Sequence, residues 1–285
     1  MKISEIIEKL NAFHPPMEAP HTCDVVKCGA PEQECSGIVV CCFASYDVIK
    51  KAAELGANLV ITHEPLFYDE TDSGEWMGND PVYAAKKKLI DEAGIVVYRD
   101  HDHIHASPAD EGREAPDGIF YGIMEELGWK DYLIGDIKKP LLYKIPKQSA
   151  ADLAQELMEK LNLTGIRTVG DMNTQVETVF FCQHITGGPG WRPGMEPPDR
   201  EQIRKVNRYN ADVIIPFEIV DWTLSAYVRD SAMAGMPKVI FEMGHFNTEE
   251  LGMKCMAGWL EKAIGEKIPT TYVQSGDSFG YVLRK

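Results

Sequence analysis

The sequence predicts an α/β fold made of two similar α/β domains, each with a mixed sheet flanked by helices. Three observations support this prediction. Strand-like apolar runs alternate with helix-like segments along all 285 residues, the second half repeats the order of the first, and no low-complexity linker separates them. We place the domains at residues 1–137 and 138–285, because the charged, proline-containing stretch Lys138-Lys139-Pro140 lies between the two copies.

Apolar runs and capping residues define the elements of the first half. Three continuous apolar runs are typical of buried strands: Ile38–Phe43, Ala57–Thr62 and Ile95–Tyr98. Helices are expected at Ile3–Leu10, where apolar residues share one face, at Ser45–Leu55, from Pro81 to a terminating Gly94, and at Pro116–Leu127.

The second half shows the same alternation. Strands are expected at Leu141–Ile145, Val179–Cys182, Ala211–Pro216 and Val239–Phe241, with two short strands near Tyr272 and Tyr281. Helices are expected from Ser149 onward, at Arg200–Tyr209 and Trp222–Gly235, and after a capping Thr248.

Two pairs of matching segments indicate an internal duplication. ANLVITHE, which ends at Glu64, aligns with ADVIIPFE, which ends at Glu218. VVYRDH, which ends at His101, aligns with VIFEMGH, which ends at His245. Each of these histidines is followed four positions later by another possible metal ligand.

Composition restricts the class of partner. The formal net charge of −15 and the pI of about 5.0 disfavour nucleic acid and anionic membranes, and leave a small molecule as the expected substrate. No apolar run reaches the roughly 18 residues of a membrane span, and carboxylates within the first apolar stretch argue against a signal peptide. Seven cysteines without an export signal fit a reducing cytoplasm.

Polar residues with metal-binding chemistry follow the predicted strands. Ligands of parallel sheets bind beyond the carboxyl ends of the strands, and six of the eight histidines fall there. They are His63, His101, His103, His105, His184 and His245. Each element also has a plainer interpretation: His63-Glu64 as a surface pair, Asp100–His105 as a histidine-rich loop that binds metal adventitiously, and Glu249 as a complement to a helix dipole.

Taken together, the three elements favour a metal centre. They supply imidazole and carboxylate groups from three strand ends, which is more than one four-coordinate zinc needs. Two metal ions that share a carboxylate would use them all, and such a pair can activate water for hydrolysis. The sequence therefore predicts two divalent ions, with zinc, iron and manganese all suited to mixed nitrogen and oxygen ligands.

Other motifs are weaker. The stretch Thr186-Gly187-Gly188-Pro189-Gly190 could cradle a phosphate, but it matches no nucleotide-binding motif and fits a flexible turn better. Cys23, Cys28 and Cys35 lack the C-x-x-C spacing of a zinc knuckle. The remaining cysteines that lie in strands are expected to be small core residues: Cys41, Cys42 and Cys182.

Three motifs resemble the GTP cyclohydrolase I type 2 homologues, also called the NGG-interacting-factor-three-like proteins. That family carries T-H-H-P-L after an apolar strand, then A-H-T-N-x-D, and near the C-terminus G-H-x-x-T-E. Here these motifs stand as Thr62-His63-Glu64-Pro65-Leu66, as Asp100–His105, and as Gly244-His245-Phe246-Asn247-Thr248-Glu249. The resemblance covers nearly the whole chain, although the middle motif is degraded.

The resemblance implies two similar α/β domains with a di-metal site between them, assembled as a hexameric ring. Carried over by position, the metal ligands would be His63, Glu64, His105, His245 and Glu249. We take His101 and Glu64 as the candidate catalytic residues. The implied function is a metal-dependent hydrolase that acts on a small phosphorylated or heterocyclic molecule, with GTP ring opening as one option. The alternative is a non-catalytic metal-binding scaffold that mediates protein contacts.

Two positions depart from the family pattern. Glu64 replaces the second histidine of the first motif, and His105 replaces the aspartate that bridges the metals. The set still holds three histidines and two carboxylates, so its charge is unchanged. Because a neutral imidazole has one lone pair for a metal, it cannot bridge two ions as a carboxylate does. We therefore expect Glu64 to have taken over the bridge, with Glu249 as its rival.

Overall fold

The computed structural model describes residues 1–15, 21–69, 71–106, 116–182, 184–186, 194 and 196–283. By its internal contacts the chain divides into two compact units, which are described separately below. The first unit comprises Met1–Glu126 and Glu249–Gly276, and the second comprises Leu127–Thr248 and Asp277–Lys285. No helix within these described ranges is both long enough and apolar enough to cross a bilayer.

The first unit is built on a five-stranded sheet in the order β1-β4-β3-β2-β10. Its strands are β1 (Val26–Cys28), β2 (Ile38–Cys41), β3 (Leu59–Thr62), β4 (Val96–Arg99) and β10 (Thr270–Tyr272). Neighbouring strands are parallel except for β1, which runs antiparallel to β4. The helical segments of the first half are α1 (Ile3–Phe13), α2 (Tyr46–Glu54), η1 (Gly74–Met77), α3 (Pro81–Glu92), α4 (Asp102–His105) and α5 (Gly118–Leu127).

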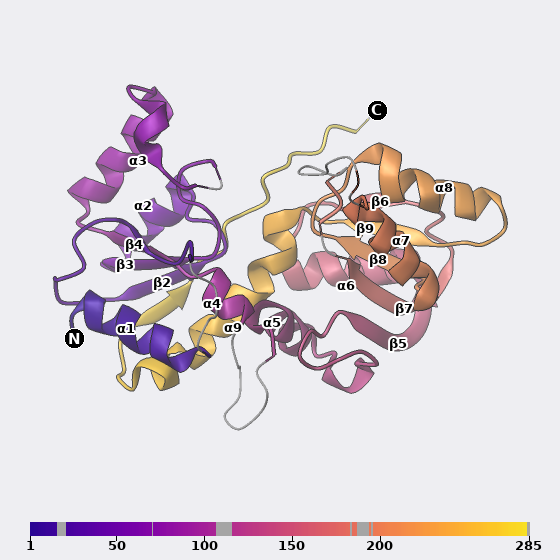
Figure 1. Ribbon diagram of the computed structural model, residues 1–285, viewed down its shortest axis with the longest axis horizontal. Coiled ribbons are helices and arrows are strands. Elements are labelled where there is room, and N and C mark those ends of the chain that lie inside the picture. Colours follow the sequence, from indigo (N-terminus) through magenta and orange to yellow (C-terminus); the bar gives the residue numbers. More distant parts are fainter. Residues whose placement is uncertain are drawn as a thin grey trace. The chain divides into compact units, whose positions relative to one another are not determined.

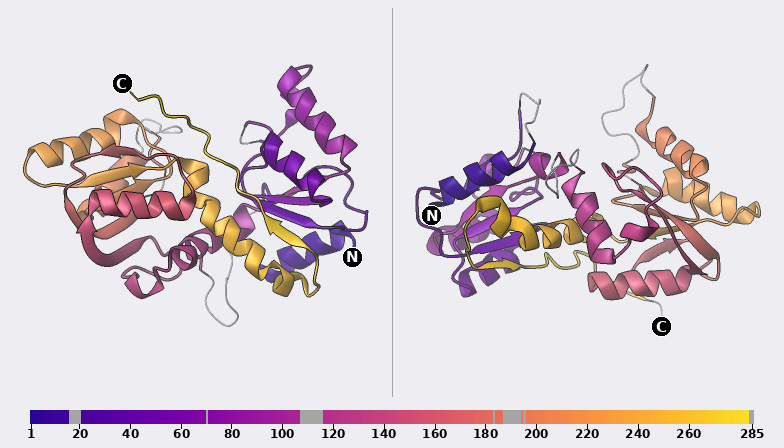
Figure 2. Two further views of the ribbon diagram at one scale, coloured as in Figure 1. Left: turned by 180° about the vertical axis from the view of Figure 1, so that it is seen from behind. Right: turned by 90° about the horizontal axis from the view of Figure 1, so that it is seen from below.

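Helices cover both faces of this sheet. Figure 1 shows α2 and α3 on one side and α1 on the other, and Figure 2 agrees. Alternate strand residues such as Val60 face α2 and α3, where Ile49 and Ile90 join the same core. On the opposite side Tyr98, at the end of β4, donates a hydrogen bond from its hydroxyl to Asn11 of α1 at 2.6 Å. The sheet is buried on both faces, as its continuous apolar runs predict.

Side-chain caps fix where these helices begin. Ser45 accepts a hydrogen bond from the backbone N–H of Val48 at 3.3 Å at the start of α2. Asp80 caps α3 in the same way and is followed by a proline at the first helical position. Gly94 follows α3 with φ +62°, a conformation that glycine adopts without steric cost. The predicted starts of α2 and α3 are therefore confirmed.

The second unit has its own five-stranded sheet, in the order β5-β7-β8-β9-β6. Its strands are β5 (Leu142–Ser149), β6 (Arg167–Val169), β7 (Gln175–Cys182), β8 (Val213–Pro216) and β9 (Val239–Glu242). β7, β8 and β9 are parallel, while β5 and β6 run antiparallel at the edges. The helical segments are η2 (Lys130–Tyr132), α6 (Ala150–Leu161), α7 (Pro198–Arg208), η3 (Asp221–Ser225) and α8 (Ala226–Met233).

Helices also cover both faces of the second sheet. The views in Figures 1 and 2 show α6 on the side opposite α7 and α8. Phe180, Ile214 and Ile240 of the three parallel strands form one core cluster with Val206 of α7 and Val228 of α8. Both units thus place three parallel strands at the centre of a helix-covered sheet. This agrees with the mixed α/β fold that the sequence predicts, while the internal duplication itself stays a prediction.

The last helix differs from its predicted start. Helix α9 (His245–Ile264) begins at His245, whereas Thr248 was expected to cap it. Gly244 has φ +91° and lets the chain turn directly from β9 into the helix, and the Thr248 hydroxyl donates back to the Gly244 carbonyl at 2.8 Å. The first four residues of α9 belong to the second unit and the rest to the first.

Smaller differences concern short elements and the boundary. The short strands β1 and β6 and the helix α4 were not predicted, and Tyr281 lies in no strand. By contacts, most of α9 and all of β10 group with the first unit, and the boundary expected between residues 137 and 138 stays a prediction. All seven cysteines are free, and Cys41, Cys42 and Cys182 are fully buried as expected.

Candidate metal centre

The site in the first unit begins with the pairing of β3 and β4. These strands are parallel and in register, with Thr62 opposite Arg99, so they end at the same edge of the sheet. The backbone N–H of Asp100 donates to the Thr62 carbonyl at 2.9 Å and extends the pairing by one residue. His63 therefore emerges beside His101, as expected for the carboxyl ends of adjacent parallel strands.

A buried aspartate turns the next segment into the short helix α4. Asp24 accepts hydrogen bonds from the backbone N–H groups of His101, Asp102 and His103 at 2.7 to 3.0 Å. These N–H groups at a helix start otherwise lack partners within the helix. Because α4 forms, His101 and His105 lie one turn apart on the same side of the helix.

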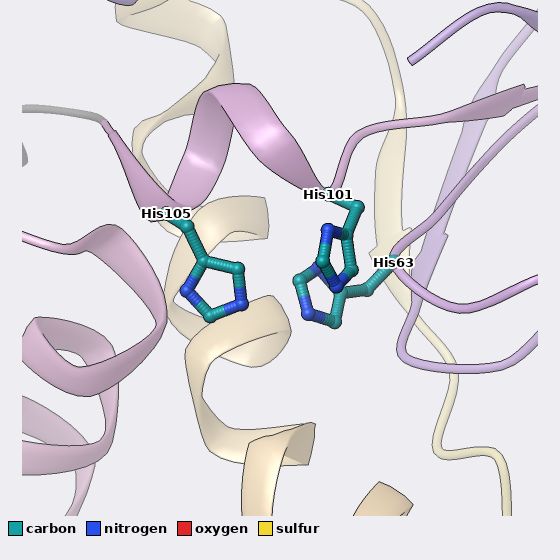
Figure 3. A group of neighbouring side chains, drawn as sticks. All are labelled: His63, His101 and His105. Carbon is teal, nitrogen blue, oxygen red and sulfur yellow. The ribbon is translucent and has the colours of Figure 1, made fainter. Parts of the chain in front are cut away.

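Three imidazole rings consequently face one another. The ring centroids of His63 and His101 are 4.5 Å apart, and His105 lies 5.0 Å from each. Figure 3 shows His101 and His105 projecting from either end of α4, with one ring nitrogen of His105 turned toward the other two rings. His63 is fully buried, while His101 and His105 are partly accessible.

Each of the three rings is held through its Nδ1 atom. His63 donates to the Asp100 carbonyl at 3.1 Å, His101 to the Asp102 carboxylate at 3.0 Å, and His105 to the Asp117 carboxylate at 2.9 Å. A carbonyl or an ionised carboxylate only accepts, so Nδ1 carries the proton and a neutral ring keeps its lone pair on Nε2. Histidines that bind metal ions are oriented in this way.

Two buried glutamates complete the group. Glu249, 2 % exposed, places Oε2 3.3 Å from His63 Nε2 and Oε1 4.0 Å from His105 Nε2. Glu64 has Oε2 3.9 Å from Arg99 Nη2. Ligand atoms of His63, His101 and His105 lie within 4.8 Å of one another, and so do those of His63, Glu64 and Glu249. The two groups share His63.

Close packing of α5 and α9 supports the positions of Glu249 and Asp117. A Cβ added to Gly122 would lie 2.8 Å from Gly252 Cα, and one added to Gly252 would lie 2.7 Å from Ile119 Cα. The two glycines thus let the helix backbones approach closely. Asp117 caps α5 with Oδ1, which accepts from Ile119 and Phe120, and holds His105 with Oδ2.

Burial and charge shift the titration of two of the rings in opposite directions. Burial disfavours the imidazolium of His63, but the carboxylates of Glu249 and Glu64 outweigh it and raise its pKa to about 9. Burial and the neighbouring rings of His63 and His105 lower the pKa of His101 to about 4. At neutral pH His101 is therefore a neutral ring with a free lone pair.

These residues fit a divalent metal ion. Three imidazoles with anchored Nδ1 atoms and two buried carboxylates form a mixed nitrogen and oxygen donor set. The carboxylates offset the charge of a cation that burial would otherwise disfavour. The plainer interpretations of His63-Glu64 as a surface pair and of Asp100–His105 as a solvated loop do not describe this geometry.

A second group of ligand-type side chains lies in the second unit. Glu218 follows β8 and accepts from the Nδ1 atoms of His184 and His245, with all three N–O distances at 2.9 Å. The two imidazoles lower the pKa of Glu218 to about 2 against the opposing effect of its burial. Ligand atoms of these three residues also lie within 4.8 Å of one another.

Comparison with known proteins identifies the family. A profile described as Duf34/NIF3 (NGG1p interacting factor 3) matches residues 1–276. The chain belongs to this family. A curated relative from Clostridium perfringens, named GTP cyclohydrolase 1 type 2 homolog, is 24% identical over 230 residues, covering 78% of this chain and 76% of the relative.

Several solved structures have the same fold as this chain. A hypothetical protein of Staphylococcus aureus matches with a TM-score of 0.69 at 16% identity, and a Bacillus cereus protein related to NIF3 with 0.69 at 14%. Each match covers 99% of both chains. Reduced HcgD from Methanocaldococcus jannaschii matches with a TM-score of 0.57 at 20% identity, over 95% of this chain and 97% of that protein.

The structure groups most of the predicted site residues. His63, Glu64, His105 and Glu249 lie together in the first unit, and His101, predicted to be catalytic, stands among them. His245, predicted as a ligand of the same centre, lies in the second unit beside Glu218 and His184, so its assignment to that centre stays a prediction.

Several supporting residues were not found from the sequence. Asp24, Asp102 and Asp117 each bind a histidine Nδ1, and only Asp102 stood within a recognised motif. His103 turns to Asp24 rather than to the three rings. The position of Asp117 at the start of a predicted helix could have indicated its role as a cap. No sequence pattern indicated the role of Asp24. Residues 187–190 of the glycine-rich stretch lie outside the described residues.

Proposed function

We propose that this chain binds two divalent metal ions at the first-unit cluster and uses them to hydrolyse a small phosphorylated or heterocyclic substrate. One observation carries the proposal. His63, His101 and His105 face one another, each anchored through Nδ1, with the buried Glu249 between two of them. A group of rings that served only packing would not need three separate acceptors to fix its orientation.

The number of ligand-type side chains supports the proposal of two ions. Five side chains offer ligand atoms, and a single tetrahedral site uses four at most. Glu249 directs a different oxygen toward His63 and toward His105, which is the arrangement that a carboxylate shared by two ions requires. Glu64 lies close to Arg99, which competes for its charge. This favours Glu249 over Glu64 as the bridge.

The residues divide the work of a hydrolysis. Divalent ions, when bound, supply Lewis acidity and lower the pKa of a bound water. His101, neutral at physiological pH, offers a lone pair that can bind a metal or accept a proton, and Asp102 holds its orientation. Glu64 offers a second buried proton acceptor beside His63. Zinc, iron and manganese all suit these donors.

The names of relatives suggest which substrates to test. The name of the Clostridium perfringens relative refers to GTP cyclohydrolase, so opening of a purine-type ring is one reaction to test. The competing function is a metal-binding scaffold, and the family description as an interacting factor favours it. A hexameric ring and a cytoplasmic location complete the proposal. Light scattering that gives a monomeric mass at all concentrations would exclude the ring.

Turnover decides between the enzyme and the scaffold. Purified protein is assayed against nucleotides, phosphomonoesters and phosphodiesters, after chelation and again after addition of zinc, iron(II) or manganese. If the protein is an enzyme, it should lose activity on chelation and regain it when metal is added. The H63A variant should then show no activity. Metal uptake of two ions per chain without turnover of any compound supports the scaffold instead. Absence of metal uptake contradicts both.

A further inference from the structure

We infer that His14, Asp24, Asp100 and His103 bind one further divalent metal ion, which we expect to be zinc. All four residues lie in the same compact unit, and none of their side chains belongs to the first-unit cluster described above. Two imidazoles and two carboxylates supply the four ligands of a closed tetrahedral site, which is typical of a structural zinc ion rather than a catalytic one. The inference does not depend on the proposed hydrolysis.

The fold brings these four side chains together from separate segments. His14 follows α1, Asp24 precedes β1, Asp100 follows β4, and His103 lies in α4. His14 Nε2 donates to Asp100 Oδ2 at 3.1 Å, and His103 Nδ1 donates to Asp24 Oδ2 at 2.6 Å. The two ring centroids are 5.8 Å apart, and ligand atoms of Asp24, Asp100 and His103 lie within 4.8 Å of one another. The two pairs therefore form one group.

Burial makes the charge of this group costly. The side chains of His14, Asp24 and Asp100 are inaccessible to solvent, and that of His103 is 15% exposed. Two carboxylates buried so close together repel each other and need positive charge beside them. Neutral imidazoles supply none, whereas a divalent ion would supply two positive charges and accept a lone pair from each of the four side chains.

One atom of the group points to a ligand independently. Asp100 Oδ1 is buried and has no hydrogen-bond partner among the residues that the structure describes, although Oδ2 of the same carboxylate accepts from His14. A buried carboxylate oxygen without a partner carries the full cost of its desolvation. The plainer interpretation, two buried polar pairs that only pack together, leaves this oxygen unexplained. A metal ion bound to Asp100 would satisfy it.

The sequence supports the same group through two departures from the family motif. The motif A-H-T-N-x-D has alanine where this chain has Asp100 and asparagine where it has His103. Alanine offers no ligand atom, and an imidazole is a better ligand for zinc than an amide oxygen is. Both departures add ligand atoms, and the fold directs both into one group.

An ion at this position would connect two parts of the first unit. His14 is fixed at the end of α1, where its backbone N–H donates to the Leu10 carbonyl at 3.3 Å and its ring lies edge-on to Trp259. Asp100 and His103 belong to the segment that also carries His101. The ion would thus tie α1 to β4 and α4, so bound zinc should raise the melting temperature.

The test counts zinc in variants that restore the family motif. In an H63A/H101A/H105A background, which removes the three rings of the first-unit cluster, zinc is added, excess metal is removed, and bound zinc is measured by elemental analysis. We expect one ion per chain, and cobalt(II) in its place should give the absorption spectrum of tetrahedral coordination. Adding D100A or H103N should lower the zinc affinity by more than about 100-fold, beyond the 10–100-fold loss when a residue only orients a ligand.

Controls keep the result interpretable. H21N, at an exposed histidine, is matched to H103N and should leave the ion bound in the same background. Zinc should raise the melting temperature of the background protein but not that of its D100A variant, and circular dichroism confirms that each variant is folded. The inference is overturned if the background protein binds no zinc, or if D100A and H103N bind it as tightly as H21N does. Loss of turnover in H63A alone tests the proposed hydrolase and leaves this count unaffected.

Discussion

The carboxyl ends of β3 and β4 carry His63 and His101, and those of β8 and β9 lead to Glu218 and His245. In the first unit the ligand-type groups are three imidazoles and two carboxylates, and His63 and Glu249 are almost fully buried. In the second unit two imidazoles surround one carboxylate, and the His184 side chain is 48% exposed. The ends of similarly placed strands thus carry two different groups of ligand-type side chains. We call the buried group around His63 the closed group and the more exposed group around Glu218 the open group.

The two groups also differ in which side chain has its pKa shifted by the neighbouring groups. In the closed group, two carboxylates in a poorly solvated space raise the pKa of His63 to about 9 despite its burial. In the open group it is the pKa of the carboxylate that shifts, because two imidazole donors lower the pKa of Glu218 to about 2 despite its burial. The first group is thus shielded from solvent, while the second is accessible to it.

The largest expected effect tests whether the closed group is one centre. H63A removes the ring that both ligand groups of the first unit share. We expect loss of both ions of the closed group, with affinity reduced more than about 100-fold, because removal of a ligand exceeds the effect of removing its orienting partner. Equilibrium dialysis with elemental analysis measures this. Retention of both ions in H63A would show that His63 is a core residue.

The next prediction separates the two candidate bridges. E249Q keeps the side-chain shape but removes a charge that lies between His63 and His105, so it should lose two ions or leave one weakly bound. E64Q should lose at most one. E250Q is the matched control, since Glu250 is equally buried on α9 but accepts hydrogen bonds from Tyr272 and Ser275. If E64Q removes both ions and E249Q neither, Glu64 is the bridge.

A smaller effect is expected from the residue that orients His105. D117N keeps the Oδ1 acceptor that caps α5 but changes the partner of His105 Nδ1. We expect a 10–100-fold loss of metal affinity with little loss of stability. D80N is the matched control, because Asp80 caps α3 with the same pair of backbone hydrogen bonds and contacts no histidine. Equal metal affinity in D117N and D80N would show that Asp117 does not orient a metal ligand.

Local patterns predicted much of the fold. Continuous apolar runs marked β2, β3, β4 and β8, because strands buried on both faces need no alternation. Ser45 and Asp80 marked helix starts through side chains that accept backbone hydrogen bonds. The short edge strands β1 and β6 have partly exposed residues and give no such pattern.

The site was predictable where its residues are close in sequence. His63-Glu64 and the Asp100–His105 segment stood out by composition, and strand-end position brought them together. Asp24 did not stand out, because its role depends on hydrogen bonds to residues 77 to 79 positions away. The Glu218 contacts with His184 and His245 likewise depend on tertiary pairing.

Helix packing gives a prediction of about 1–3 kcal/mol in unfolding free energy. G252A would place a methyl group 2.7 Å from Ile119 Cα, so it should destabilise the first unit by the cost of overpacking. G258A on the same helix is the control, since a Cβ there meets nothing within 4 Å and alanine favours helix by up to about 1 kcal/mol. Denaturant unfolding measures both, and equal stability of the two variants contradicts the packing argument.

The smallest expected signal is a proton count that distinguishes the closed group from the open one. In the metal-free protein His63 holds its proton up to a pKa of about 9, but a metal ligand must be neutral. Loading the closed group at pH 7.5 should therefore release about one proton from His63, and the number should fall toward zero above pH 9. His101, with a pKa of about 4, adds protons only in acid.

The same raised pKa predicts how stability depends on pH. The folded pKa of His63 lies above its unfolded value of about 6.5, so its contribution to metal-free stability is complete below that value and is lost as the pH rises through 9. Calorimetric titration in buffers of different ionisation enthalpy counts the released protons, and H63A, which should bind no ion in the closed group, gives the background signal. A proton count that stays constant from pH 7.5 to pH 10 would mean that Glu249 and Glu64 do not hold His63 in its charged form, and the distinction between the two groups would lose its electrostatic basis.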